Sequence, residues 1–271
     1  MALNTEQQQR ELTRVYQNAL FQTQLMGRIA RLSPAEEARQ FEARGFEHFE
    51  TERAQKKPVI LAGSHLGVNR LFPLWLARQG VEVLSLEELD QLALMGVEKP
   101  DTLQSVALRS TFPAQATMLA LRHLKSGGVC HLTGDNPRPA AVNVYQVRTF
   151  HGLEKECPRG LANLSLMSGS AIPPYFRTIH DRGRVLIEIH PPIRPQTPLA
   201  PADSPERQAQ NIQLTDSFAV VLIAEINGAP GNHAGGGWTS SRVRDWPEPQ
   251  FPWLPNPGQK RAIRVSRLLT V

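Results

Sequence analysis

The sequence has little cysteine, and this scarcity excludes two classes of protein. Only Cys130 and Cys157 occur in 271 residues, so the disulfide framework of a small secreted protein cannot form. Their spacing matches no pattern of zinc ligands. Cys130 stands inside an apolar run, where a cysteine usually behaves as a small buried hydrophobic residue. We expect neither disulfide bonds nor a metal.

Long hydrophobic runs are also missing. No apolar stretch approaches the roughly 20 residues that cross a bilayer. The first residues do not combine a basic start, an apolar run and a small-residue cleavage site, which would indicate a signal peptide. We therefore expect a cytoplasmic protein, and we leave open peripheral contact with the inner face of the cell membrane.

Acidic residues are fewer than basic ones, which gives a formal net charge of +5 in an otherwise ordinary globular composition. Excess positive charge favours an anionic partner: a phospholipid surface, a phosphorylated substrate, an acidic carrier protein or nucleic acid. The sequence contains no recognised nucleic-acid-binding module and no aromatic stacking pattern, so nucleic acid is not expected.

Hydrophobic periodicity divides the chain into three parts. Residues 1–57 are predicted to be a helical extension, in which a second helix starts at the capping residue Ser33 and continues to about Arg53. Residues 58–245 alternate short apolar strands with helices. Residues 246–271 form a proline-rich basic tail.

The alternation in residues 58–245 predicts an α/β fold with a mixed, largely parallel sheet flanked by helices. The predicted strands cover residues 59–62, 81–84, 128–132, 142–147, 171–179 and 185–189. The predicted helices cover residues 71–78, 114–125, 158–167 and 204–226.

Two strand ends carry residues suited to acid–base chemistry. His65 follows the first apolar run, and Asp135 and Arg138 follow the run at 128–132. Open α/β sheets place their sites at the carboxyl ends of strands, so we expect His65 and Asp135 to emerge at the same edge. Taken alone, such a histidine is more often structural than catalytic, and such an aspartate is more often part of an Asx turn or a solvated loop.

A third candidate segment precedes the predicted helix at 158–167. Arg159 and Gly160 stand at its start, after Phe150-His151-Gly152. Free N–H groups and the helix dipole at such an end attract phosphate and carboxylate groups. A lone arginine there is ordinarily a surface residue, so this signal is weak by itself.

The order of these segments is more specific than any one of them. In chain order they are His65-Leu66-Gly67 after a strand, Gly127-Gly128-Val129 before the strand that ends in Asp135-Asn136-Pro137, Phe150-x-Gly152, Pro158-x-Gly160-Leu161-Ala162 at a helix start, and Ser168 to Pro174 before a strand. This order resembles the bacterial lipid A (lauroyl/myristoyl) biosynthesis acyltransferases of the lysophospholipid acyltransferase-like superfamily. The resemblance runs from about Pro58 to Ile193 and continues weakly to Pro230 and Trp238.

The resemblance implies an activity and a set of site residues. Members of the family transfer a fatty acyl chain from acyl carrier protein or coenzyme A to a lipid hydroxyl, directly and with no metal or other cofactor. By resemblance His65 is the general base. By resemblance Phe150, Gly152, Arg159 and Gly160 line the substrate cleft. Asn69, Arg70 and Arg138 are further candidates for substrate binding.

The sequence departs from the family at one position. Members carry Asp or Glu five positions after the histidine, whereas this chain has Arg70, whose positive charge cannot stabilise an imidazolium. Three explanations remain open. Asp135 replaces the missing acid, or Asn69 fixes the histidine tautomer by a hydrogen bond, or the chain is a catalytically degenerate relative that binds acyl donor, lipid or a partner protein.

Overall fold

The structure is a computed structural model that describes residues 5–29, 31–65, 71–87, 91–94, 96–108, 111–135, 144–148, 154–179 and 184–228. Met1–Trp238 form one compact unit. The helices are α1 (Thr5–Ile29), α2 (Pro34–Gln40), α3 (Phe46–Ala54), α4 (Leu71–Arg78), α5 (Gln91–Leu94), α6 (Pro113–Lys125), α7 (Gly160–Ser168) and α8 (Pro205–Gly228). The strands are β1 (Phe41–Arg44), β2 (Val59–Gly63), β3 (Val83–Glu87), β4 (Leu103–Ala107), β5 (Val129–Thr133), β6 (Val144–Arg148), β7 (Glu154–Pro158), β8 (Tyr175–Ile179) and β9 (Val185–Ile189).

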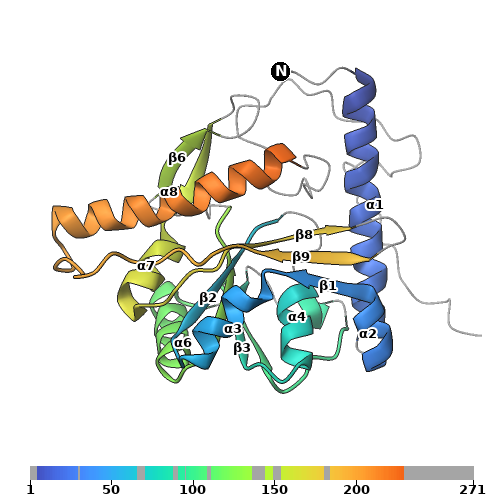
Figure 1. Cartoon of the computed structure of the whole chain (residues 1–271), viewed down its shortest axis with the longest axis horizontal. Helices are drawn as coiled ribbons and strands as arrows, with labels where there is room; N and C mark the ends of the chain where they lie inside the picture. The colour runs from blue at the N-terminus through green and yellow to red at the C-terminus, as the bar shows by residue number, and fades with distance from the viewer. Residues whose placement is uncertain are drawn as a thin grey trace, which may run out of the picture. The chain divides into compact units, whose positions relative to one another are not determined.

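The central sheet has four parallel strands in the order β2-β5-β3-β4. A second sheet has the order β1-β9-β8, with β1 parallel and β8 antiparallel to β9. Bridges from Val59 to Ala171 and from Ala62 to Pro174 join the segment before β8 to β2, so the two sheets continue edge to edge. β6 and β7 form a separate antiparallel pair, and α8 lies beside β6 (Figure 1). The predicted α/β fold is confirmed.

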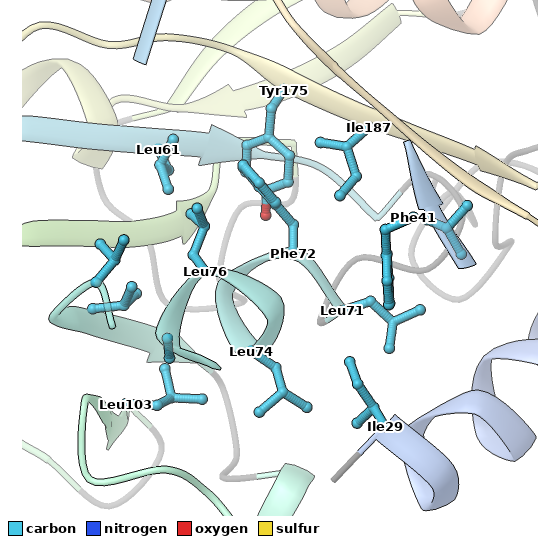
Figure 2. Close-up of a cluster of buried hydrophobic side chains, with 14 of the residues drawn as sticks. Ile29, Phe41, Leu61, Leu71, Phe72, Leu74, Leu76, Leu103, Tyr175 and Ile187 are labelled. Atoms are coloured by element: carbon cyan, nitrogen blue, oxygen red, sulfur yellow. The ribbon is translucent and has the colours of Figure 1, made fainter. Parts of the chain in front are cut away.

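Alternating residues of β2 face two different helical layers. Val59 and Leu61 of β2 belong to one hydrophobic cluster with residues of α1, α3 and α4. Ile60 and Ala62 belong to a second cluster with residues of α6, α7 and α8. Figure 2 shows the first cluster, in which Phe72 of α4 lies against the Tyr175 ring. Both faces of the sheet are therefore covered, which explains why β2 is buried along its whole length.

The N-terminal region is more closely joined to the sheet than the sequence predicts. The prediction that the second helix continues to Arg53 is wrong, because Phe41–Arg44 form β1 and pair with β9. Phe41 is 6% exposed and Ile29 is fully buried in the same cluster (Figure 2). Pairing with β9 and burial of Phe41 outweigh the local helical preference of this segment. The end of α1 thus packs its apolar residues on the domain.

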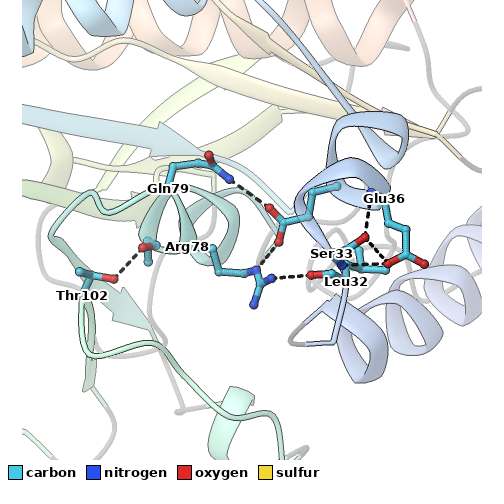
Figure 3. Close-up of polar contacts among 8 residues, drawn as sticks. Leu32, Ser33, Glu36, Arg78, Gln79 and Thr102 are labelled. Atoms are coloured by element: carbon cyan, nitrogen blue, oxygen red, sulfur yellow. Dashed lines mark hydrogen bonds and ion pairs between the residues drawn. The ribbon is translucent and has the colours of Figure 1, made fainter.

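A polar cluster fastens α2 to the end of α4 (Figure 3). Glu37 of α2 accepts hydrogen bonds from Arg78 and, at 3.0 Å, from Gln79. Arg78 also donates to the Leu32 carbonyl oxygen at 2.9 Å. The predicted start of α2 is confirmed, because Ser33 forms a capping box with the third helical residue.

A buried carboxylate at the amino end of β2 gives a prediction about stability and pH. Glu52 of α3 is 1% exposed and accepts two hydrogen bonds from Arg194, both of 2.6 Å. The hydrogen bonds from Arg194 lower the pKa of Glu52. A carboxyl group whose pKa is lower in the folded state stabilises the fold above its unfolded-state pKa, and this contribution is lost as the pH falls through the folded-state value.

We expect Glu52→Gln to lower the free energy of unfolding by about 2 kcal/mol near pH 7, the usual size of a charge-assisted hydrogen bond. The difference from the wild type should shrink below about pH 4.5. Urea unfolding at several pH values measures it. A difference in the free energy of unfolding that stays constant down to pH 3 would contradict the stabilising role of the ionised Glu52 carboxylate.

Candidate active site

The pairing of β2 with β5 sets the position of the candidate residues. The two strands are parallel and paired residue for residue, with Leu61 beside His131 and Gly63 beside Thr133. The same offset of 70 positions brings His65 opposite Asp135, just beyond the last paired residues. Both side chains therefore stand at the carboxyl edge of the sheet, where open α/β proteins place their sites.

His65 and Asp135 are in direct contact. The Asp135 Oδ1 atom lies 2.7 Å from the His65 Nδ1 atom, and Asp135 Oδ2 accepts the His65 backbone N–H at 2.8 Å. The Asp135 side chain is fully buried, whereas 31% of the His65 side chain is exposed. The contact expected from the shared sheet edge is present. One buried carboxylate thus holds both the main chain and the ring of the histidine.

This geometry fixes the proton on the imidazole. An ionised carboxylate only accepts hydrogen bonds, so the contact with Asp135 requires the proton of a neutral ring to be on Nδ1. The lone pair is then on Nε2, which becomes the basic nitrogen. The same carboxylate stabilises the imidazolium after Nε2 takes up a proton. The arrangement is therefore suited to general acid–base chemistry.

Two glycines allow the chain to pass close to neighbouring rings at this edge. A Cβ atom on Gly63 would lie 2.7 Å from the Tyr175 hydroxyl oxygen, and one on Gly134 would lie 2.7 Å from a ring carbon of Phe218. The Gly134 N–H donates to the Gly63 carbonyl oxygen at 2.9 Å, which extends the ladder between β2 and β5 past the strands. A side chain at either position would displace the segment that carries His65 or Asp135.

Arg177 and Tyr175 of β8 are buried near the pair. Arg177 is 1% exposed, and its Nη2 atom donates to the Ser64 carbonyl oxygen at 3.3 Å. Its guanidinium lies 4.4 Å from the centre of the Tyr175 ring, a cation–π contact. Burial raises the pKa of Tyr175 to about 12, with Arg177 acting against the shift and Asp135 adding to it. The Tyr175 hydroxyl therefore stays protonated at neutral pH.

A second histidine lies inside the sheet. His131 of β5 is beside Ser85 of β3 in the register, and the Ser85 Oγ atom is 2.7 Å from His131 Nδ1. Ser85 donates its single hydroxyl proton to Glu87 at 2.8 Å. Ser85 must then accept from His131, so Nδ1 carries a proton on this histidine too. His131 is 2% exposed, and this buried contact orders the strands beneath the site.

Arg159 and Gly160 stand at the start of α7, as expected. Arg159 is the half-buried residue that precedes the helix, and Gly160 is its exposed first residue. Their assignment to substrate binding stays a prediction. The other predicted substrate-binding residues, Asn69, Arg70, Arg138, Phe150 and Gly152, lie outside the described residues, as do the basic tail, Pro230 and Trp238.

The buried cysteine Cys130 is separate from the His65–Asp135 pair. Cys130 is fully buried, and burial raises the pKa of its thiol to about 12, which confirms that it is a small buried hydrophobic residue. In the part of the chain that the structure describes, no three His, Cys, Asp or Glu residues are grouped closely enough to hold a metal ion.

Sequence reasoning identified His65 and Asp135 but missed the groups around them. Arg177, Tyr175, Ser85 and Glu87 were not expected at the site. The signal for Arg177 is present in the sequence, because an arginine in the middle of the apolar segment 171–179 must find polar partners when that strand is buried. The contacts of Ser85 depend on strand order, which local patterns do not contain.

The fold and the part-buried His65–Asp135 contact define an α/β protein with a histidine–carboxylate pair at the carboxyl edge of its sheet. The family model for bacterial lipid A biosynthesis acyltransferases matches residues 4–215. The chain therefore belongs to this family, and the resemblance inferred from the motif order is confirmed. Membership supports acyltransferase activity in general, with an acyl donor and a lipid acceptor as substrates. Comparison with the curated proteins found no match.

Proposed function

We propose that this protein transfers a fatty acyl chain from acyl carrier protein or coenzyme A to a hydroxyl, or an amine, of a lipid-like acceptor. In this proposal His65 is the general base and Asp135 is its carboxylate partner. The observation that carries the proposal is the 2.7 Å contact between the imidazole Nδ1 and the Asp135 carboxylate at the sheet edge. Asp135 then takes the role that the family gives to an acid five positions after the histidine.

The reaction needs one proton acceptor and no covalent enzyme intermediate. The His65 Nε2 atom takes the proton of the acceptor hydroxyl. At the same time the hydroxyl oxygen attacks the thioester carbonyl carbon. The carbonyl oxygen becomes an oxyanion, which hydrogen-bond donors must stabilise. When the carbonyl re-forms, the carbon–sulfur bond breaks and the thiolate takes the proton from the imidazolium. Asp135 stabilises the imidazolium between these two steps.

The remaining predicted residues belong to substrate binding in this proposal. The position of Arg159 and Gly160 at the start of α7 supports their proposed role in binding an anionic group. Phe150 and Gly152 are assigned by family resemblance, and Asn69, Arg70 and Arg138 remain candidates from their places in the sequence.

A catalytically degenerate relative is the second candidate, because Arg70 stands where the family has its acid. Such a protein would bind acyl donor, lipid or a partner protein without turnover. Arg70→Glu separates the two candidates. A degenerate relative with an otherwise intact cleft should gain transfer, whereas an enzyme that already uses Asp135 should gain little or lose activity.

The most direct test of the function is to incubate the purified protein with labelled acyl-ACP, and separately acyl-CoA, together with a total lipid extract. The proposal predicts a labelled lipid product from at least one donor. Hydrolysis of the donor without acceptor labelling does not count as success, because water can replace the acceptor slowly. Absence of any labelled lipid with either donor would favour the binding protein.

Membrane attachment is a further part of the proposal. Among the described residues, no helix is long and apolar enough to cross a bilayer. We propose that membrane binding depends on two segments. One is the part of α1 around Leu20, whose side chain is 62% exposed, and the other is the basic tail with Lys260, Arg261 and Arg264.

We expect the protein to float with anionic vesicles at low salt and to be released at high salt. Each cation near such a surface contributes about 1 kcal/mol, and salt screens the attraction. Flotation with phosphatidylglycerol vesicles measures it, with neutral phosphatidylcholine vesicles as the control. No binding at low salt, or binding that salt does not change, would count against this mode of attachment.

A further inference from the structure

The peptide group between Ser64 and His65 is held at both ends by buried charges of opposite sign. Its carbonyl oxygen accepts a hydrogen bond from Arg177 Nη2 at 3.3 Å. Its N–H donates to Asp135 Oδ2 at 2.8 Å. Arg177 is 1% exposed and Asp135 is 0% exposed, so water screens neither charge well.

The orientation of this peptide group suits both charges. A peptide dipole has its negative end at the oxygen and its positive end at the N–H, so the oxygen faces the cation and the N–H faces the anion. The group therefore stabilises both ions, and the ions in turn fix its plane. Removal of either ion would leave the other with one fewer compensating charge inside the protein.

Other contacts fix the guanidinium itself. Arg177 lies 4.4 Å from the centre of the Tyr175 ring, and the Tyr175 ring packs on Phe72 at a centroid distance of 4.6 Å. Tyr175 is fully buried, and its hydroxyl passes close to Gly63. These contacts hold the Arg177 guanidinium beside Ser64, the first residue after β2.

We propose that Arg177 is a positioning residue of the acyl-transfer site, which fixes the Ser64–His65 peptide from the side opposite to Asp135 and so sets where the imidazole stands. This inference rests on the proposed function only for its effect on turnover. Arg177 acts through the main chain of His65 rather than on substrate. Because a misplacement of about 1 Å can cost about 100-fold in rate, a lost carbonyl contact should be visible in kcat.

The experiment compares Arg177→Met, which keeps an unbranched apolar stem but removes the charge and the donor groups, with Arg177→Lys, which keeps the charge but only one donor group. Hydrogen exchange of the His65 amide by NMR reports the peptide directly. We expect this amide to exchange at least tenfold faster in Arg177→Met and by a smaller factor in Arg177→Lys. In the assay kcat should fall 10- to 100-fold in Arg177→Met, donor KM should stay within about twofold, and lysine should restore part of kcat.

Two controls separate positioning from general loss of stability. Arg194→Met removes another arginine with a buried carboxylate partner, Glu52 at 2.6 Å, and should change neither the His65 amide nor kcat. The Ile60 amide, which bonds the Ala171 carbonyl oxygen at 2.9 Å, should keep its protection in every folded variant. If Arg177→Met does not fold, the exchange rate of the His65 amide in Arg177→Lys tests the proposal instead.

Unchanged exchange of the His65 amide in a folded Arg177 variant would overturn the positioning role, whether or not turnover is lost. A wild-type protein without transfer activity would instead overturn the proposed function, while faster amide exchange in Arg177→Met would still support the contact. The two failures are therefore distinguishable.

Discussion

His65→Ala is expected to lower acyl-transfer turnover by at least about 100-fold in a protein that remains folded. A hydroxyl is a poor nucleophile until a base takes its proton, and alanine offers no base. The His65 side chain is 31% exposed, so its removal leaves no large internal cavity. Turnover should be measured with labelled acyl donor and the accepted lipid, and folding by circular dichroism and thermal unfolding.

The matched control is His48→Ala, which removes a half-buried histidine of α3. This variant should keep its turnover. Wild-type turnover in a folded His65→Ala protein would remove the catalytic role of this residue, and an equal loss in both variants would point to a general defect instead.

Asp135→Asn is expected to have the second large effect, a fall in kcat of between about 100- and 10,000-fold with unchanged binding of the acyl donor. The carboxylate accepts at two oxygens, 2.7 Å from the His65 ring and 2.8 Å from its backbone N–H. An asparagine has one acceptor oxygen and an NH₂ group, so one of these two donors must face another donor. Either the tautomer or the main chain of His65 is then disturbed, and the negative charge that stabilises the imidazolium is lost.

Glu52→Gln is a suitable control for this substitution. It neutralises another buried carboxylate, which lies before the amino end of β2, whereas His65 lies after the carboxyl end. We expect Glu52→Gln to lose stability and keep kcat. Donor affinity, measured by titration with a non-hydrolysable acyl thioester analogue, should be the same in both variants. A folded Asp135→Asn protein with wild-type kcat would exclude Asp135 as the partner of His65 and leave Asn69 as the residue that fixes the histidine tautomer.

The sequence predicted helices and strands correctly where an apolar pattern has clear ends. Helix α4 is found at the predicted residues 71–78, because an apolar helical pattern ends at Gly80, which has a φ of +80°. The buried strand β9 also matches its prediction at residues 185–189. Strands β1, β4 and β7 were missed because polar residues interrupt their apolar patterns, so their pairing partners rather than their own patterns define them.

The site was predictable where topology alone decides it. Two parallel strands that each end in a candidate residue must present those residues at one edge, so the sequence alone predicts that Asp135 lies near His65. The hydrogen bond from Arg177 to the Ser64 carbonyl oxygen was not predictable in the same way. It comes from β8, which follows His65 by more than a hundred residues. The segment before β8 is joined to β2 by bridges such as Val59 to Ala171.

The central claim is that His65 and Asp135 act as one catalytic unit, and a double-mutant cycle on kcat tests it most directly. Residues that act as a unit are strongly non-additive, because the second removal has nothing left to disturb. We predict that the His65→Ala/Asp135→Asn double variant is no more than about threefold slower than the slower single variant. Losses that multiply across the two sites would contradict the account, since they would show that each residue contributes without the other.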